Sequence, residues 1–118
     1  MPRQEPGEPY FRVDSNEASS ILNEDAEGAV VVDVRRDDEW ETGHITGAVH
    51  IPIDDLPDRI GEVPRDKKVL FICAMGVRSG LACEVAFSMG YETDNLYNID
   101  DGTPAWIAAG LPTTFPGR

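Results

Sequence analysis

A cysteine with glycine, arginine and serine close behind it is the feature of this sequence best suited to chemistry. In the stretch KVLFICAMGVRSG, Cys73 directly follows an apolar run, and Gly76, Arg78 and Ser79 come within the next six positions. A thiolate is a strong nucleophile, and nearby cations and backbone amides favour it over the thiol. Such surroundings lower a cysteine pKa from about 8.5 into roughly the 3.5–7.5 range. The spacing therefore predicts a nucleophilic sulfur held in a tight loop.

A strand before this loop and a helix after it would position the sulfur. The short apolar run at 69–72 predicts the strand. Beyond the loop, apolar residues recur at helical spacing: Leu81, Ala82, Val85, Ala86 and Met89. Unpaired N–H groups and the positive end of the helix dipole would then point toward Cys73, and Gly76 permits the turn. The alternative is a buried cysteine that ends a core strand, with Arg78 as a solvated charge at the helix start.

Length and charge restrict the classes of function. The chain has 118 residues, of which 41% are hydrophobic, enough for one compact domain with a core. Ten basic and 22 acidic residues give a net charge of −12, which argues against a nucleic-acid partner because phosphate contacts require Lys and Arg. No apolar run approaches the ~20 residues of a membrane span, and the first residues lack the apolar core of a signal peptide. We expect an acidic protein of the cytoplasm with no membrane partner.

The cysteines and histidines show no spacing typical of a metal site. Cys73 and Cys83 are ten residues apart without a CxxC motif, and His44 and His50 are separated from both. We therefore expect no metal, no cofactor and no disulfide framework. Cys83 falls within the predicted helix, where we interpret it as a small packed residue rather than a second reactive thiol.

Strand and helix signals alternate along the chain. Apolar and β-branched runs predict strands at 10–13, 29–34, 48–51, 69–72 and 95–99. Helices are expected after Asp14 or Ser15, at 37–41, from 54 or 55 to 60, between the cysteine loop and Gly90, and from Pro104 to Gly110. The alternation predicts an α/β fold with a mostly parallel sheet. Residues 1–9 are expected to form a flexible arm, 10–112 the domain and 113–118 a tail.

Four segments together resemble the rhodanese family, a family of sulfurtransferase domains. They are VVDVR at 31–35, EWETGHITGAVHIP at 39–52, VLFICAMGVRS at 69–79 and DGTPAWIAAGLP at 101–112. The segments occur in the family's order and spacing, and the resemblance covers nearly the whole chain after residue 10. It implies a five-stranded, mostly parallel sheet flanked by helices, with the cysteine loop at the sheet's carboxyl edge.

The resemblance also implies roles for individual residues. Cys73 would accept a sulfane sulfur from thiosulfate or a persulfide and pass it to cyanide or a thiol. The loop around the sulfur would consist of Ala74, Met75, Gly76, Val77, Arg78 and Ser79, with Arg78 holding an anionic donor. Asp33 and Arg35 match the family's Asp-x-Arg pair at the carboxyl end of a strand. They would brace the loop, or form an ion pair with no catalytic part. The donor or acceptor could itself be a protein.

Other residues of the matching segments are expected to be structural. Under this resemblance His44 and His50 serve the structure, Glu39 belongs to a hydrogen-bond network, and Trp106 packs the last helix into the core. Asp101 stands where the family usually has the first of two glycines, and aspartate can adopt the left-handed conformation of such a turn.

The loop itself departs from what a small dianion would require. Ala74, Met75 and Val77 are apolar, so Arg78 is the only charged residue between positions 74 and 79. This composition weakens thiosulfate as the physiological donor and favours a low-molecular-weight or protein persulfide.

Three other functions remain open at this point. Phosphatases of the related fold place five residues between the cysteine and the arginine, whereas four separate Cys73 from Arg78 here. The shorter loop suits one sulfur better than a tetrahedral phosphate. Some rhodanese-like domains act only as interaction or regulatory modules, but these often lack the cysteine. A persulfide carrier that works only with a partner is the third possibility.

Overall fold

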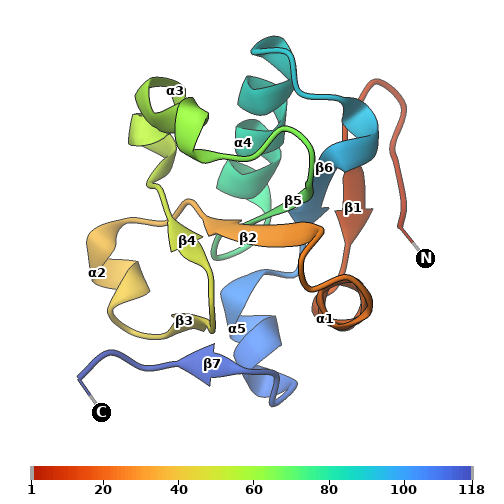
Figure 1. The fold of residues 1–118 in the computed structure, drawn as a ribbon. Helices are drawn as coiled ribbons and strands as arrows, with labels where there is room; N and C mark the ends of the chain where they lie inside the picture. Colours follow the sequence, from red (N-terminus) through yellow and green to blue (C-terminus); the bar gives the residue numbers. More distant parts are fainter. Residues whose placement is uncertain (1, 118) are drawn as a thin grey trace.

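A five-stranded parallel sheet forms the centre of the molecule (Figure 1). The computed structural model describes residues 2–117. The strands are β1 (Phe11–Val13), β2 (Ala29–Asp33), β4 (Val49–His50), β5 (Lys68–Ile72) and β6 (Leu96–Ile99). Their order across the sheet is β1-β6-β5-β2-β4, and every pairing in it is parallel. The predicted α/β fold with a five-stranded parallel sheet is confirmed, and β5, which leads into Cys73, is the central strand.

Helices cover both faces of this sheet. They are α1 (Ser15–Glu24), α2 (Asp37–Trp40), α3 (Leu56–Arg59), α4 (Val77–Ser88) and α5 (Gly102–Ala108), with 3-10 turns at Ile53–Asp55, Ile60–Glu62 and Thr93–Asn95. Figure 1 shows α1 and α5 on one side of the sheet and α3 and α4 on the other. None of the helices in residues 2–117 is long and apolar enough to cross a membrane.

Each face of the sheet carries its own apolar core. On the side of α1 and α5 the core includes Trp106, which is 2% exposed and confirms that this residue packs the last helix inward. On the side of α3 and α4 the core includes Leu56, Phe71 and Cys83. Because strands of a parallel sheet are covered on both faces, they require the continuous apolar runs seen in the sequence.

The buried face of α4 differs from the one that apolar spacing suggested. Leu81 is 50% exposed and Met89 38% exposed. Ala82 and Ala86 are buried, as the spacing suggested, but the other buried residues of the helix are Ser79, Gly80 and Cys83. All five are small. A Cβ on Gly80 would lie 3.1 Å from the Tyr10 hydroxyl, so the helix approaches its neighbours closely. Close approach selects small side chains for the inner face and leaves the large ones outside.

Residues of the predicted arm and of the predicted tail make regular backbone contacts with the domain. Arg3 and Arg12 exchange two backbone hydrogen bonds of 2.8 and 2.6 Å, so part of the predicted arm folds back along β1. In the predicted tail, β7 (Thr113–Thr114) pairs with β3 (His44–Ile45) as a two-stranded antiparallel ribbon. The ordered fold therefore extends beyond the predicted boundary at 112. Residues 1 and 118 of the predicted arm and tail lie outside the described part of the chain.

Candidate active site

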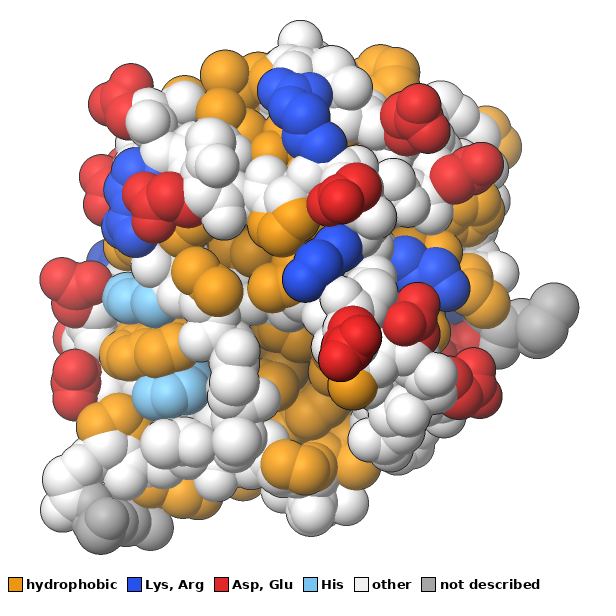
Figure 2. Space-filling view, in the orientation of Figure 1, with side chains coloured by type: hydrophobic (Ala, Val, Ile, Leu, Met, Phe, Trp, Pro, Cys, Tyr) orange, Lys and Arg blue, Asp and Glu red, His pale blue; other side chains and the backbone are white. Residues whose placement is uncertain are grey.

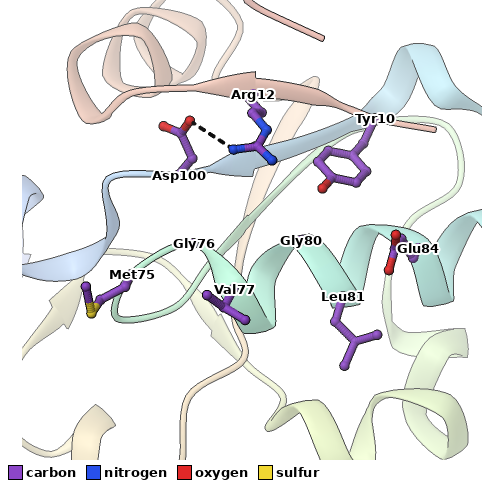
Figure 3. Close-up of a pocket in the computed structure, with 9 residues that line it drawn as sticks. All are labelled: Tyr10, Arg12, Met75, Gly76, Val77, Gly80, Leu81, Glu84 and Asp100. Atoms are coloured by element: carbon purple, nitrogen blue, oxygen red, sulfur yellow. Dashed lines mark ion pairs between the residues drawn. The ribbon is translucent and has the colours of Figure 1, made fainter. Parts of the chain in front are cut away.

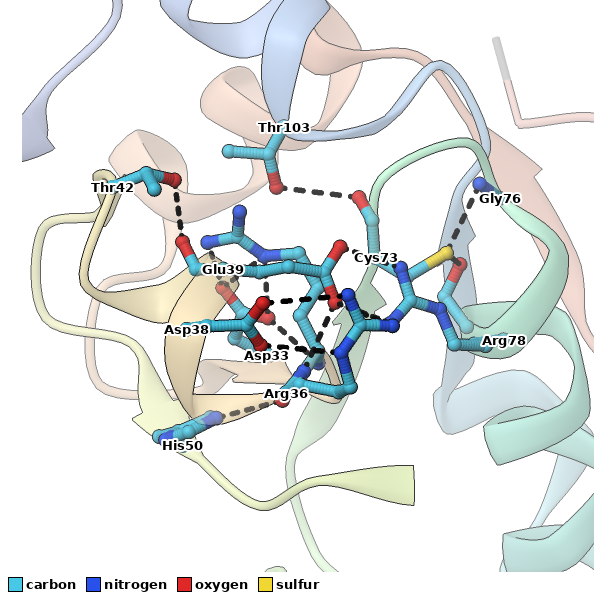
Figure 4. Close-up of polar contacts among 12 residues, drawn as sticks. Asp33, Arg36, Asp38, Glu39, Thr42, His50, Cys73, Gly76, Arg78 and Thr103 are labelled. Carbon is cyan, nitrogen blue, oxygen red and sulfur yellow. Dashed lines mark hydrogen bonds and ion pairs between the residues drawn. The ribbon is translucent and has the colours of Figure 1, made fainter. Parts of the chain in front are cut away.

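The sulfur of Cys73 lies inside the turn that links β5 to α4. The backbone N–H of Gly76 donates to the sulfur at 3.1 Å (Figure 4). The hydroxyl of Ser79 lies 3.2 Å from the sulfur. Cys73 is only 1% exposed. The loop therefore forms a small cradle of backbone and hydroxyl groups around one sulfur atom at the start of a helix, as the spacing predicted.

Two opposing effects set the protonation of this thiol. Burial raises the pKa of Cys73, whereas hydrogen bonds from the Ser79 side chain and from the amides of Ser79, Met75 and Gly76 lower it. The net result is a pKa below the ordinary value of a cysteine. Thiolate is the nucleophilic form of the side chain, so the cradle favours attack by this sulfur.

Residues 100–103 support the cradle from behind. Gly76 has φ of +86°, and a Cβ there would lie 2.5 Å from the carbonyl oxygen of Asp100. Gly102 has φ of +78°, and a Cβ there would lie 1.9 Å from the carbonyl oxygen of Ala74. Thr103 donates to the Cys73 carbonyl from its amide at 3.0 Å and from its hydroxyl at 3.2 Å (Figure 4). Gly102, at the second position of the family's two-glycine turn, is thus required by close backbone packing.

Asp101 keeps this turn without the left-handed conformation that we expected. Its φ and ψ are −88° and −11°, so Gly102 alone carries the positive φ. The Asp101 carboxylate accepts hydrogen bonds from the amide of Ser15 at 3.1 Å and from its hydroxyl at 2.9 Å. The side chain that replaces a glycine here connects the loop support to α1.

Arg78 forms an ion pair with Glu39, although we had expected its charge to serve a bound anion. Its two terminal nitrogens donate to the two Glu39 oxygens at 2.6 and 2.9 Å (Figure 4). The hydrogen bonds from Arg78 lower the pKa of Glu39 to about 2, against a smaller opposing effect of burial. The expected hydrogen-bond network at Glu39 is present, and it neutralises the one cation of the loop.

Asp33 and Arg35 form a buried ion pair at the end of β2. The Arg35 guanidinium donates to both Asp33 oxygens, with a shortest bond of 2.8 Å, and to the carbonyl of Gly43 at 2.8 Å. Asp33 is fully buried and Arg35 is 4% exposed. These contacts connect the strand end to the segment before β3, and none of them reaches the sulfur.

The two histidines stack on one aromatic side chain. The rings of His44 and His50 lie nearly parallel to Trp40, with centroid distances of 3.4 and 4.5 Å. His44 Nδ1 lies 3.1 Å from the Trp40 carbonyl, and His50 Nε2 lies 2.8 Å from the Arg35 carbonyl. Figure 2 shows the two histidines, in pale blue, close together at the left of the molecular surface. Their contacts are those of structural residues, in line with the expectation.

The outer side of the loop is apolar and open. Met75 is 79% exposed and Val77 is 78% exposed. Beside them a cavity of about 420 Å³ lies between the start of α4 and the ends of β1 and β6 (Figure 3). Arg12 lines this cavity, but it pairs with Glu8 at 2.7 Å and lies 3.9 Å from Asp100. The approach to the loop therefore combines apolar side chains with Arg12, a cation that is already paired, and with the carboxylate of Glu84.

Cys83 is separated from this chemistry. It is fully buried in the apolar core, and burial raises the pKa of its thiol well above the ordinary value. Within residues 2–117, no three His, Cys, Asp or Glu side chains gather in a way that could hold a metal ion. The absence of a metal or cofactor from the working protein stays a prediction.

Two polar residues next to the loop were not found from the sequence. Asn98 on β6 contacts both Ser79 and Gly76, and Thr103 contacts the Cys73 carbonyl. The available signal was weak: Asn98 is a polar residue within the otherwise apolar and aromatic strand at 96–99. Only the pairing of β6 with β5 places it beside the cysteine loop.

The fold and the loop define the class of the protein. The sequence matches the rhodanese-like domain family over residues 15–109, and the chain belongs to this family. A solved rhodanese-like domain from Anabaena sp. has a TM-score of 0.78 at 28% identity, covering 94% of this chain and 83% of the other. A rhodanese-related protein from Thermoplasma volcanium has a TM-score of 0.71 at 33% identity, covering 82% and 94%.

Two relatives with similar sequences are named as sulfurtransferases. A sulfurtransferase of Allochromatium vinosum is 35% identical over 104 residues, which span 88% of this chain and 94% of the relative. The thiosulfate sulfurtransferase GlpE of Pseudomonas entomophila is 38% identical over 93 residues, which span 79% of each chain. The chain is thus a member of a sulfurtransferase family.

Proposed function

We propose that the protein is an enzyme that transfers a sulfane sulfur through a persulfide on Cys73. The observation that carries this proposal is the cradle itself, in which the Gly76 amide and the Ser79 hydroxyl lie within 3.2 Å of a sulfur at the start of α4. The donor is thiosulfate or a persulfide, and the acceptor is cyanide or a thiol. The sulfurtransferase relatives support the same reaction class.

The first step forms the persulfide. The Cys73 thiolate attacks the outer sulfur of thiosulfate, the S–S bond of the donor breaks, and sulfite leaves with the bonding electron pair. With a thiol persulfide as donor, the thiol leaves instead. The backbone amides are fixed dipoles that stabilise negative charge on sulfur without having to reorganise.

The second step returns the enzyme to its starting state. Cyanide attacks the terminal sulfur of the persulfide, thiocyanate leaves, and Cys73 is released as a thiolate. Because the enzyme carries the sulfur covalently between two separate substrates, the scheme predicts ping-pong kinetics.

Charge around the loop bears on the choice of donor. Arg78 is paired with Glu39, and the exposed loop residues Met75 and Val77 are apolar. A dianion such as thiosulfate finds no uncompensated cation in this loop, so we propose that a persulfide of a small thiol or of a protein is the preferred donor. The exposed apolar side chains next to the loop also favour contact with a protein partner, as a partner-dependent persulfide carrier would require.

Initial-rate kinetics test the proposed function. Rates are measured while thiosulfate or glutathione persulfide is varied at several cyanide concentrations, in the wild type, in Cys73→Ser and in Cys83→Ala as the matched control. The proposal expects parallel lines in double-reciprocal plots, loss of turnover in Cys73→Ser and retention of turnover in Cys83→Ala. Turnover that survives in Cys73→Ser contradicts it. A folded wild type that is inactive with both donors favours an interaction module instead.

A further inference from the structure

A buried side-chain amide on β6 contacts two of the residues that hydrogen-bond to the sulfur of Cys73. Asn98 is 1% exposed. Its Oδ1 accepts a hydrogen bond from the Ser79 hydroxyl at 2.5 Å, and its Nδ2 donates to the Gly76 carbonyl at 3.0 Å. Ser79 and Gly76 are the residues whose hydroxyl and amide lie 3.2 and 3.1 Å from the sulfur of Cys73. Asn98 is therefore connected to the sulfur through two residues, Ser79 and Gly76, and does not contact it directly.

The partners of Asn98 fix the direction of each hydrogen bond. The Gly76 carbonyl can only accept, so the NH₂ group of Asn98 must face it and the oxygen must face Ser79. A serine hydroxyl has a single proton. While that proton is donated to Asn98, the Ser79 oxygen can only accept from the thiol of Cys73. The resting chain of donors therefore runs from Cys73 through Ser79 to Asn98.

Ionisation of the sulfur changes what Ser79 must do. The thiolate has no proton to donate, and Ser79 stabilises it only by turning its own proton toward the sulfur. The oxygen of Asn98 then loses its donor in a site closed to water, which carries a free-energy cost. In the described part of the chain every buried side-chain nitrogen or oxygen has a hydrogen-bond partner, so this loss would be an exception.

We propose that Asn98 is a positioning residue that controls whether the Ser79 hydroxyl stabilises the thiol or the thiolate of Cys73. By competing for the hydroxyl proton it opposes ionisation of the free enzyme, and by holding the Gly76 carbonyl it keeps the loop amide aimed at the sulfur. The role of Asn98 in sulfur transfer rests on the function proposed above. The change of hydrogen-bond partner by Ser79 does not depend on that function.

Charged groups near the loop could shift the same pKa directly. Arg78 of α4 pairs with Glu39 of α2. The hydrogen bonds to Glu39 raise the pKa of Arg78 against the opposing effect of burial, and Cys73 and Asp33 raise it further by smaller amounts. Arg12 of β1, Glu84 of α4 and Asp100 line the cavity beside the loop. Arg35 lies at the end of β2, and Asp101 follows β6. Variants that leave all of these charged residues unchanged isolate the effect of the Ser79 hydroxyl on the pKa of Cys73.

A double-mutant cycle uses such variants. The pKa of Cys73 is measured from the ultraviolet absorbance of the thiolate, after subtraction of Cys73→Ser, in four proteins: the wild type, Asn98→Leu, Ser79→Ala and the double variant. Leucine matches the shape of asparagine and removes its oxygen. We expect Asn98→Leu to lower the pKa by roughly half to one unit while Ser79 is present, since one competing hydrogen bond is removed.

The effect of Asn98→Leu in the Ser79→Ala protein shows whether Asn98 acts through the Ser79 hydroxyl or only by supporting the loop. Loss of the contact to Gly76 is common to both backgrounds, so in Ser79→Ala the fall in pKa should disappear or reverse. An equal shift in both backgrounds, or a rise in the presence of Ser79, overturns the proposal. The measurement needs no sulfur donor, and an inactive protein would still give the cycle.

A second measurement needs no substitution at Asn98. The side-chain amide resonances of Asn98 in the wild type are followed by NMR as a function of pH. We expect them to shift with the midpoint of Cys73 ionisation, and to shift much less in Ser79→Ala. Resonances that stay constant through that midpoint in the wild type overturn the proposal even if Asn98→Leu fails to fold.

Discussion

Glu39 and Arg78 form a two-bond ion pair between α2 and the start of α4, with N–O distances of 2.6 and 2.9 Å. The pair joins the segment after β2 to the sulfur loop after β5, the central strand. It also cancels the only charge that the loop residues 74–79 contribute. An arginine that seemed available for a substrate is therefore occupied by a carboxylate of the protein itself.

Neutralising Glu39 should improve the use of a dianionic donor. In Glu39→Gln the shape and a hydrogen-bond acceptor remain, but the positive charge of Arg78 is no longer cancelled. We expect the KM for thiosulfate to fall about fivefold, as about 1 kcal/mol of charge interaction near a protein surface would give. Cyanide carries a single negative charge, so its KM in the second step serves as a reference and should change less than the KM for thiosulfate. An unchanged or higher KM for thiosulfate would show that Glu39 does not limit the donor.

The same pair should make stability depend on pH in the acid range. The folded pKa of Glu39 is about 2, below the ordinary value of 4.5, because Arg78 donates two hydrogen bonds to it. Its contribution is therefore complete above about pH 4.5 and is lost as the pH falls through about 2. We expect the stability difference between wild type and Glu39→Gln in urea unfolding to shrink between about pH 5 and about pH 2.5. A difference that stays constant over this range would contradict the assigned shift.

Gly102 should be intolerant of any side chain. Its φ is +78°, and an added Cβ would lie 1.9 Å from the Ala74 carbonyl oxygen within the cradle. Gly110 has a similar φ of +73° but no atom within 4 Å of the added Cβ, which makes it a matched control. We expect Gly110→Ala to cost about 1–2 kcal/mol from the backbone conformation alone. Gly102→Ala should cost at least about 3 kcal/mol and reduce sulfur transfer. Equal losses in thermal unfolding would refute the close contact.

The Asp33–Arg35 pair should serve stability more than chemistry. Asp33→Asn leaves the buried Arg35 guanidinium without a counter-charge, and we expect a loss of about 2–4 kcal/mol in urea unfolding. Asp38→Asn is the control, because Asp38 pairs with Arg36 over the same spacing on the surface, with side chains 72% and 69% exposed, and its removal should change the midpoint little. Activity per folded molecule of Asp33→Asn should stay close to that of the wild type. A loss of activity without a loss of stability would assign the pair a part in the reaction.

Sequence patterns were sufficient for the five strands of the parallel sheet, most of the helices and the cysteine loop. Apolar runs such as 29–34 and 69–72 are long enough to be recognised, and the types at Cys73, Gly76 and Ser79 reveal their chemistry. Features that depend on distant pairing were not accessible in the same way. The bond from Arg78 to Glu39, the place of Asn98 beside the loop and the pairing of Thr113–Thr114 with β3 each join segments at least 19 residues apart.

The inner face of α4 illustrates a different limit. Periodicity alone ranks Leu81 and Met89 as core residues because they are large and apolar. The structure buries only the small members of that pattern, Ala82 and Ala86, together with Gly80 and Cys83, since the helix lies too close to its neighbours for larger side chains. Apolar spacing identifies a helix, whereas the distance between packed elements decides which face is buried.

The central claim, a persulfide on Cys73, is tested most directly by weighing the intact protein without reductant. Wild type, Cys73→Ser and Cys83→Ala are each incubated with thiosulfate or with glutathione persulfide, and a portion is then treated with cyanide. We predict a gain of one sulfur atom in wild type and in Cys83→Ala, its removal by cyanide with formation of thiocyanate, and no gain in Cys73→Ser. A gain that persists in Cys73→Ser, or a folded wild type that takes up no sulfur from either donor, would contradict the account.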